Sequence, residues 1–218
     1  MGIMSKFLSQ WQKPTGRLGR AAVRAMNISH SKLADWGLER IPIEKTWTIL
    51  DVGCGGGMTV RKLANIATAG KVYGIDYSES SVSVAQRTNQ PFIDMGRVEI
   101  RQAPVSCLPF SDDMFDLVTT VDSHYYWPDL VADLREVWRV LKPGGTLIII
   151  GEGYRGGIYG VLYKKWAKQF KMTFTSARDL AELLARAGYS EVQSFEAGGR
   201  NWICVIGRKS STQRMAGS

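Results

Sequence analysis

The residues whose types and spacing point most clearly to chemistry form a glycine-rich turn at positions 53–57. Four of these five residues are glycines, and an acidic residue, Asp51, stands two positions before the first of them. Because glycine has no Cβ, such a turn lets the backbone approach a ligand closely. The dinucleotide-binding fingerprint would need a glycine in place of Met58, and the Gly-Lys-Ser/Thr of a phosphate-binding loop is absent. We therefore predict a ligand-binding turn of a different kind.

A second carboxylate, Asp76, ends the next apolar segment of the chain. In nucleotide sites an acidic residue at such a position accepts hydrogen bonds from ribose hydroxyls. The alternative is that Asp76 caps the following helix, although Ser78 is already a competent N-cap. Because ligands bind at the carboxyl ends of parallel strands, we expect Asp51 and Asp76 to face one crevice.

A third group of reactive side chains lies in Val121–Pro128, which offers a carboxylate, an imidazole and three aromatic rings. An imidazole has an ordinary pKa of about 6.5 and can act as a general base, and aromatic rings can wall a pocket or hold a cation. We take His124, Asp122 and Tyr125 as candidate catalytic residues. The alternative is that His124 and Tyr125 only pack the loop. The other histidine, His30, is more typical of a surface or packing residue.

Composition excludes several classes of protein. The chain has 218 residues, of which 44% are apolar and 22% charged, so global disorder is excluded. It has no apolar run long enough to span a membrane and no secretory leader, so we expect a soluble, cytoplasmic protein. The three cysteines, Cys54, Cys107 and Cys204, form no CxxC pair and are expected to be small buried apolar residues. With two histidines in the chain, we predict no metal site.

The net charge of +8 comes from the two flanks of the chain. Residues 1–46 carry eight Lys/Arg against three Asp/Glu and residues 153–218 eleven against four, whereas residues 47–152 carry nine against thirteen. Basic flanks can attract acidic small molecules, anionic lipids or nucleic acid, or can simply be solvated. Residues 160–171 interleave bulky apolar and basic side chains, which fits a helix on a membrane surface or a cap helix packed on the core. No RNA-binding module is recognisable, so we do not expect a nucleic-acid partner.

The elements that must position these residues alternate between strand and helix. Strands are expected at Thr48–Val52, Lys71–Asp76, Val98–Gln102, Phe115–Val121, Thr146–Gly151, Val192–Glu196 and Asn201–Gly207. One predicted helix is capped by Asp129 and runs from Leu130 to Leu141, where Lys142–Gly145 ends it. Another is capped by Ser176 and ends at Gly188. The pattern predicts an α/β fold with a doubly wound, mostly parallel seven-stranded sheet and an antiparallel C-terminal strand.

The chain divides into one domain with appendages. Residues 1–46 are predicted to form an N-terminal helical extension, either a lid that closes over the site or a subunit contact. Residues 47–209 form the ligand-binding domain, and within it residues 153–172 are a cap insertion after the fifth strand. Residues 210–218 are polar and are expected to form a frayed tail.

Four segments together resemble, in order and spacing, the class I S-adenosylmethionine-dependent methyltransferases. They are Ile49–Gly57, Val72–Ser78, Leu108–Val118 and Leu141–Thr146. The similarity covers residues 47–152 most closely, and it is greatest to the small-molecule branch related to ubiquinone and menaquinone methyltransferases. The resemblance implies a Rossmann-like methyltransferase fold with S-adenosyl-L-methionine as cofactor. It also implies methyl transfer to a small molecule, an acidic one included, with release of S-adenosylhomocysteine.

The resemblance also implies roles for individual residues. The glycine turn would hold the methionine half of the cofactor, Asp51 would organise the turn and reach the ammonium group, and Asp76 would hold the ribose. Pro104 stands where the family usually has an acid, so adenine would be held by the backbone around Val105 and by apolar walls. The cofactor-binding residues so implied are Asp51, Gly53, Cys54, Gly55, Gly57, Asp76, Tyr77, Pro104, Val105 and Asp122.

Two other functions stay open at this point. One is a methyltransferase that acts on an anionic lipid or RNA, which the basic flanks would favour. The other is a module that binds S-adenosylmethionine without catalysis. Peripheral membrane contact also stays open, and the sequence identifies neither the acceptor nor the oligomeric state.

Overall fold

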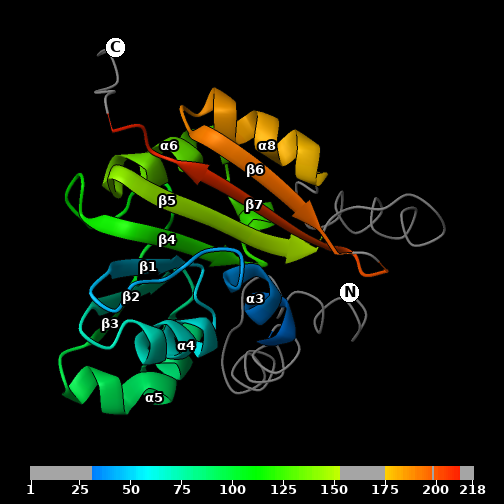
Figure 1. The fold of residues 1–218 in the computed structure, drawn as a ribbon. Helices are drawn as coiled ribbons and strands as arrows, with labels where there is room; N and C mark the ends of the chain where they lie inside the picture. The colour runs from blue at the N-terminus through cyan, green and yellow to red at the C-terminus, as the bar shows by residue number, and fades with distance from the viewer. Residues whose placement is uncertain (1–30, 153–174, 198, 212–218) are drawn as a thin grey trace, which may run out of the picture.

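The computed structural model describes residues 31–152, 175–197 and 199–211. Within them, seven strands form one sheet in the order β3-β2-β1-β4-β5-β7-β6 (Figure 1). The strands are β1 (Thr48–Val52), β2 (Lys71–Asp76), β3 (Val98–Gln102), β4 (Phe115–Val121), β5 (Leu141–Glu152), β6 (Ser190–Glu196) and β7 (Trp202–Arg208). Strands β1 to β5 pair in parallel, and β7 runs antiparallel to both β5 and β6. The predicted fold class is confirmed.

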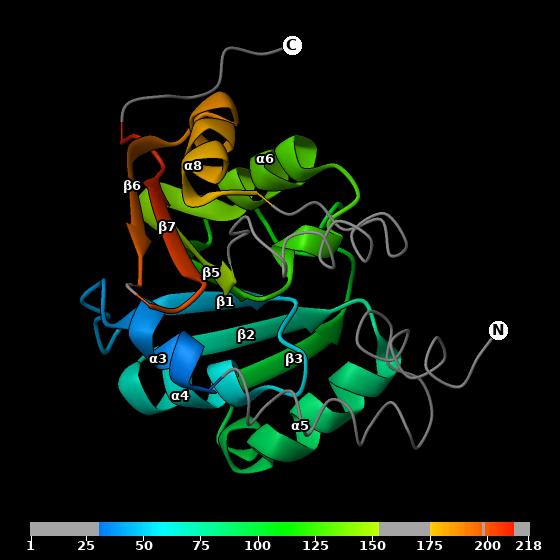
Figure 2. The ribbon, with the colours of Figure 1, turned by 90° about the vertical axis from the view of Figure 1, so that its right-hand side faces the viewer.

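Helices cover both faces of the sheet. They are α3 (Ser31–Leu38), α4 (Met58–Ile66), α5 (Glu79–Asp94), α6 (Leu130–Val140) and α8 (Ala177–Arg186), with a short 3₁₀ turn, η1 (His124–Tyr126), before α6. Helices α3, α4 and α5 lie on one face, and α6 and α8 lie on the other (Figure 2). A sheet covered in this way has apolar side chains on both faces.

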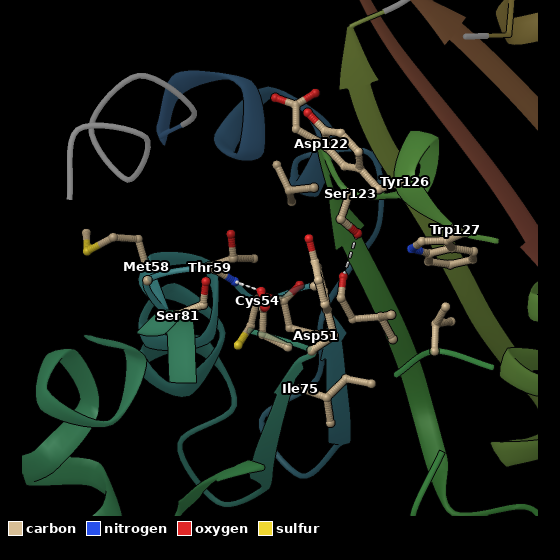
Figure 3. Close-up of a pocket in the computed structure, with 18 of the residues that line it drawn as sticks. Asp51, Cys54, Met58, Thr59, Ile75, Ser81, Asp122, Ser123, Tyr126 and Trp127 are labelled. Carbon is tan, nitrogen blue, oxygen red and sulfur yellow. Dashed lines mark hydrogen bonds between the residues drawn. The ribbon is translucent and has the colours of Figure 1, made fainter. Parts of the chain in front are cut away.

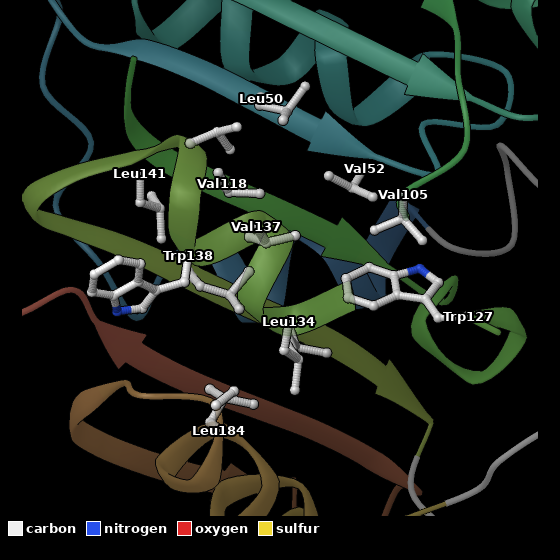
Figure 4. Packing of buried hydrophobic residues seen from close by; sticks show 14 of the residues in the cluster. Leu50, Val52, Val105, Val118, Trp127, Leu134, Val137, Trp138, Leu141 and Leu184 are labelled. Carbon is white, nitrogen blue, oxygen red and sulfur yellow. The ribbon is translucent and has the colours of Figure 1, made fainter. Parts of the chain in front are cut away.

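Two hydrophobic cores follow from this layering. Along β5, Ile148 and Ile150 point into the core under α3–α5, whereas Leu147 and Ile149 point into the core under α6 and α8. Figure 4 shows the second core, where Leu134 of α6 packs between the sheet and α8. Side chains alternate because successive residues of a strand point to opposite faces. The run of apolar residues in β5 is therefore required by its central position.

The predicted helix caps are present. Ser78 Oγ accepts a hydrogen bond from Ser81 N (3.4 Å) at the start of α5. The Asp129 carboxylate accepts from two backbone N–H groups at the start of α6 (3.2 and 3.1 Å). Ser176 Oγ accepts from Asp179 N (3.1 Å) at the start of α8. Each cap satisfies a backbone donor that has no partner within the helix.

The fifth strand begins earlier than predicted. Helix α6 ends at Val140, and Leu141 already pairs with Phe115 in β4. Pairing continues at Leu117 and Thr146 after an irregularity in the register. The expected free turn at residues 142–145 is therefore a bulge inside β5, because backbone pairing with β4 resumes on both sides of it.

Three expectations concern residues only partly described. Helix α3 is the described part of the predicted N-terminal extension, and it packs against β5 and β7. The rest of that extension with His30, the cap insertion at 153–172 and residues 212–218 of the tail lie outside the described residues.

Cys54 and Cys204 are buried as expected, but the expectation for Cys107 is wrong, because Cys107 lies exposed in the loop between β3 and β4. None of the described helices is long and apolar enough to cross a membrane.

Candidate active site

A cavity of about 340 Å³ opens at the carboxyl ends of β1, β2 and β4 (Figure 3). Strand β1 lies between β2 and β4 in the sheet. The connection after β1 passes through α4 on one face, whereas the connection after β4 passes through α6 on the other face. In an open α/β sheet this change of direction creates a crevice where ligands bind. The cavity thus lies at the carboxyl ends of the strands, where the sequence predicted a ligand-binding crevice.

The glycine turn forms one wall of the cavity. The N–H groups of Gly53 and Cys54 both donate to Ile75 O (2.9 and 2.8 Å), which ties the turn to β2. Gly55 has a φ of +52°, and a Cβ on it would meet no atom within 4 Å. The turn therefore leaves Gly55 open for a ligand to lie against its backbone.

Gly57 packs on α5 and does not line the cavity, so the cofactor contact that the resemblance implied for it stays a prediction that this geometry does not favour. Its neighbour Gly56 lines the cavity instead. Gly57 is the N-cap of α4 with a φ of +79°, and a Cβ there would lie 2.5 Å from Asn89 Nδ2 and 2.9 Å from Ala85 Cα. Asn89 Nδ2 also donates to Gly57 O (2.9 Å). Gly57 is thus required for close packing of the turn on α5.

Asp51 is a buried carboxylate on the cavity wall. Its side chain is 2% exposed, and Oδ1 accepts a hydrogen bond from Thr119 Oγ1 (2.7 Å). The pKa of Asp51 is raised to about 7, mainly by burial and also by the nearby charge of Asp76, while the hydrogen bond from Thr119 opposes this rise. A cationic group of a ligand would relieve this cost, because an opposite charge favours the ionised form.

Asp76 organises the turn and faces the cavity. Its Oδ2 accepts from Gly55 N (3.0 Å) and its Oδ1 from Ser78 N (2.8 Å). Burial raises the pKa of Asp76, and these backbone donors oppose that effect. Each carboxylate oxygen has two lone pairs, so the side chain retains acceptor capacity for ligand hydroxyls. The N-cap of α5 is Ser78, so the alternative role of Asp76 as a helix cap is wrong, and its role toward a ribose stays a prediction that this geometry allows.

An apolar slot lies beyond Asp76. Ala103, Pro104 and Val105 line it together with Ile75. Behind the slot, Ser106 Oγ donates to Asp133 Oδ1 of α6 (2.6 Å). Helix α6 therefore holds the segment after β3 in place, and no acidic side chain from residues 103–105 enters the slot.

The third wall comes from the loop after β4. Asp122, Ser123 and Tyr126 line the cavity, and Met58 lies across from them on α4 (Figure 3). Tyr126 is partly buried, and burial raises its pKa to about 12, so its hydroxyl stays protonated. Asp122 has a left-handed backbone, with a φ of +50°.

His124 and Tyr125 do not line the cavity. His124 is 1% exposed, and neither of its ring nitrogens has a hydrogen-bond partner among the described residues. Burial lowers the pKa of His124 to about 3, so the ring is neutral. The structure thus separates Asp122, in the cavity wall, from the other two candidate catalytic residues, which pack behind it. The general-base role of His124 stays a prediction that this geometry does not favour.

Several cavity residues are not among the individually predicted site residues, although those at 121–128 belong to the segment whose aromatic rings were expected to wall a pocket. Besides Gly56 they include Ser31, Ala34, Val52, Met58, Thr59, Lys62, Ile75, Ser81, Ala103, Val121, Ser123, Tyr126, Trp127 and Pro128. Residues directly after the glycine turn, such as Met58, could have been found from their position at the start of α4. No local signal marks α3, which reaches the cavity only through tertiary packing. Lys62 helps to hold it there, since its Nζ donates to Ser31 O (3.0 Å) and pairs with Asp35.

The donor set fits S-adenosyl-L-methionine. Asp51 offers a carboxylate for an ammonium group, Asp76 offers acceptors for ribose hydroxyls, and the slot at Val105 offers apolar walls for a flat base. The open backbone at Gly55 fits the close approach of the methionine portion. Nothing comparable exists for a metal ion, since the described residues contain no group of three or more His, Cys, Asp or Glu side chains able to hold one. Fold and site together define a class I S-adenosylmethionine-dependent methyltransferase.

Comparison with known proteins leads to the same family. Residues 50–149 match the family model described as a methyltransferase domain. The demethylmenaquinone methyltransferase of Bacillus cereus is 30% identical over 167 residues, which cover 66% of this chain and 70% of that protein. The enzyme of the same name from Oceanobacillus iheyensis is 27% identical over 192 residues, covering 76% and 80%. The structure of a SAM-dependent methyltransferase from Aquifex aeolicus superposes with a TM-score of 0.73 at 22% identity, covering 87% of this chain and 97% of that one.

The chain therefore belongs to the class I S-adenosylmethionine-dependent methyltransferases, and its cofactor is S-adenosyl-L-methionine. The sequence-based predictions of family, enzyme class and cofactor are confirmed. The individual cofactor contacts stay predictions. Nine of the ten residues implied by the resemblance line the cavity, Gly57 being the exception.

Proposed function

We propose that the acceptor is a small aromatic molecule of the quinol type, methylated on a ring carbon. The observation that carries the proposal is the composition of the cavity wall beyond the cofactor residues. Met58 offers a polarisable apolar surface, Tyr126 an aromatic ring and Asp122 a carboxylate. This combination suits a flat ring with a hydroxyl group. The names of the relatives, demethylmenaquinone methyltransferases, support the same class of acceptor. A phenolic hydroxyl is weakly acidic, in line with the expected acidic small molecule.

The chain's own residues would align the cofactor with the acceptor and accept the proton of the acceptor's hydroxyl group. S-adenosyl-L-methionine, when bound, supplies a methyl group on a positively charged sulfur. Asp51 and the glycine turn would fix the methionine portion, and Asp76 the ribose. Tyr126 would orient the acceptor ring, and the closed wall would exclude water, which is catalysis by positioning. A ring carbon becomes a good nucleophile when the neighbouring hydroxyl gives up its proton, and the Asp122 carboxylate would accept it. Once the carbon has taken the methyl group from sulfur, it would lose its own hydrogen as a proton and the ring oxygen would regain one. The net products would be the methylated quinol, S-adenosylhomocysteine and one proton.

The test uses methyl-labelled S-adenosylmethionine and a short-chain demethylmenaquinone analogue, supplied in its reduced and oxidised forms. We expect label in the reduced acceptor only, because the oxidised ring is electrophilic. Asp122→Asn keeps the shape but cannot accept the proton, and it should lower turnover by roughly 100-fold or more. Asp94→Asn, on the exposed side of α5, is the matched control and should retain full turnover.

The same labelled cofactor, added to a cell extract, separates the alternatives. Label confined to lipid or RNA would overturn the small-molecule acceptor and make the basic flanks the substrate surface. Label in no fraction and in neither form of the analogue, with S-adenosylhomocysteine binding intact, would favour the binding module. The expected cytoplasmic location stays a prediction, and the oligomeric state is open.

A further inference from the structure

A hydrogen-bonded cluster lies behind the cavity wall that is formed by the loop after β4, and it joins this loop to the end of β5. The Tyr125 hydroxyl donates to Asp122 Oδ1. The Glu152 backbone N–H points at both side chains, 3.1 Å from Asp122 Oδ1 and 3.0 Å from the Tyr125 hydroxyl oxygen. One oxygen of the Asp122 carboxylate is thus held by two donors from two different elements. Bonds to an ionised group are stronger than bonds between neutral groups.

The backbone around this cluster is adapted to it. Asp122 is one of three described non-glycine residues with a positive φ, a conformation that costs free energy for a residue with a side chain. Its N–H continues the sheet by donating to Ile150 O (2.9 Å). A Cβ at Gly151 would lie 2.7 Å from the Tyr125 hydroxyl and 3.3 Å from Asp122 Oδ1. The cluster fits against β5 only because residue 151 is glycine.

Packing also fixes the Tyr125 ring. Tyr125 is 5% exposed and lies between two other rings, with centroids 4.1 Å away at His124 and 5.9 Å away at Tyr126. Burial and the neighbouring Asp122 charge raise the pKa of Tyr125 well above its usual range, so the hydroxyl remains a donor at working pH. The neutral His124 ring then serves as a wall for Tyr125.

We infer that Tyr125 is a positioning residue that acts through Asp122: its hydroxyl, together with the Glu152 N–H, fixes one oxygen of the Asp122 carboxylate and so sets the orientation of this side chain in the cavity wall. This inference rests on the proposed function, in which Asp122 accepts the acceptor's proton. It gives Tyr125 a role without contact to the reacting atoms. It also makes the end of β5 part of the active-site support.

A double-mutant cycle tests this directly. Tyr125→Phe removes one hydroxyl and keeps the ring, and we expect kcat/KM for the reduced acceptor to fall roughly 10- to 100-fold. In the Asp122→Asn background the same change should lower kcat/KM by less than about twofold, because residues that act through one another are not additive. The affinity for S-adenosylhomocysteine should stay within about threefold in both backgrounds. Tyr189→Phe is the matched control, since Tyr189 is equally buried and its hydroxyl donates to Leu134 O (2.9 Å) away from the cavity.

Two results would overturn the inference. One is an equal loss from Tyr125→Phe with and without the Asp122 carboxylate, and the other is no loss at all. If the wild type does not methylate the acceptor, the proposed function fails, and the Glu152 amide then decides on the cluster itself. The NMR resonance and the hydrogen-exchange protection of the Glu152 amide should change in Tyr125→Phe and in Asp122→Asn. An unchanged Glu152 amide would overturn the inference whatever the acceptor.

Discussion

Replacement of Asp51 by asparagine should make the ligand-free protein more stable and its cofactor binding weaker. Asp51 is buried, and its carboxylate accepts a hydrogen bond from the Thr119 hydroxyl. The pKa of this carboxyl rises from 3.8 to about 7 on folding. One pKa unit corresponds to about 1.4 kcal/mol, so ionised Asp51 costs the folded state roughly 4 kcal/mol above pH 7. The asparagine side chain would keep an acceptor for Thr119 and carry no charge.

The sign follows from proton binding in the two states. Between pH 4 and 7 the folded protein retains a proton on Asp51 that the unfolded chain has lost, so its contribution to stability falls as pH rises. Below pH 4 both states are protonated, and above pH 7 neither is. The free energy of unfolding of Asp51→Asn, minus that of the wild type, should therefore rise with pH and reach a plateau of about 4 kcal/mol near pH 8.

Urea unfolding at several pH values between 4 and 8.5 measures this difference, and calorimetry measures S-adenosylhomocysteine affinity on the same samples. We expect affinity to fall about 10- to 100-fold at pH 8, because a charge-assisted hydrogen bond to the ammonium group is lost. Asp94→Asn, an exposed carboxylate on α5, should change stability by less than about 0.5 kcal/mol at every pH. A stability difference for Asp51→Asn that does not vary with pH would refute the argument that burial raises the Asp51 pKa.

Other predictions use the same assays. Gly55→Ala places a methyl group in the cavity and strains a positive φ, so we expect weaker S-adenosylhomocysteine binding. In Gly57→Ala the added methyl group collides with α5, so the free energy of unfolding should fall by about 2 kcal/mol or more. If both variants lost affinity and stability to the same extent, the separate roles of Gly55 in ligand binding and Gly57 in packing would be contradicted. His124 is buried with a pKa lowered to about 3, so between pH 6.5 and 3 the unfolded chain binds a proton there that the folded protein does not. The free energy of unfolding of the wild type, minus that of His124→Ala, should therefore fall as pH falls below 6.5. Parallel pH profiles for the two proteins would contradict it.

Much of the fold could be predicted because local signals agree with the tertiary structure. The bounds predicted for β1 to β4 match the structure: β1, β2 and β4 carry several buried apolar residues in succession, and in β3 apolar residues alternate with polar ones. The start of β5 could not be predicted in this way. Lys142–Gly145 has the composition of a turn, and only pairing with β4 on both sides makes it a bulge within a strand.

The site could be predicted only in part, because a residue of the right type contributes to it only if the backbone turns that residue toward the cavity. Sequence identified the glycine turn but not which glycines face the cavity, since Gly56 lines it and Gly57 packs on α5. The loop after β4 has the same difficulty. Ser123 and Tyr126 line the cavity whereas His124 and Tyr125 do not, because residues three apart in a 3₁₀ turn lie on the same side of it. Spacing alone does not reveal where such a turn begins.

Three described features that break local rules lie at the carboxyl ends of the strands, where the cavity opens. Asp51 is a buried carboxyl with a pKa near 7, Asp122 has a left-handed backbone, and Gly55 is held open. By contrast, the buried Asp133 on α6 has a hydroxyl and a backbone N–H as partners. Such concentrations of unfavourable local choices are expected where function requires them. Selection of variants for stability alone should therefore favour changes at Asp51 and Asp122, and the variants obtained should bind cofactor or turn over acceptor less well.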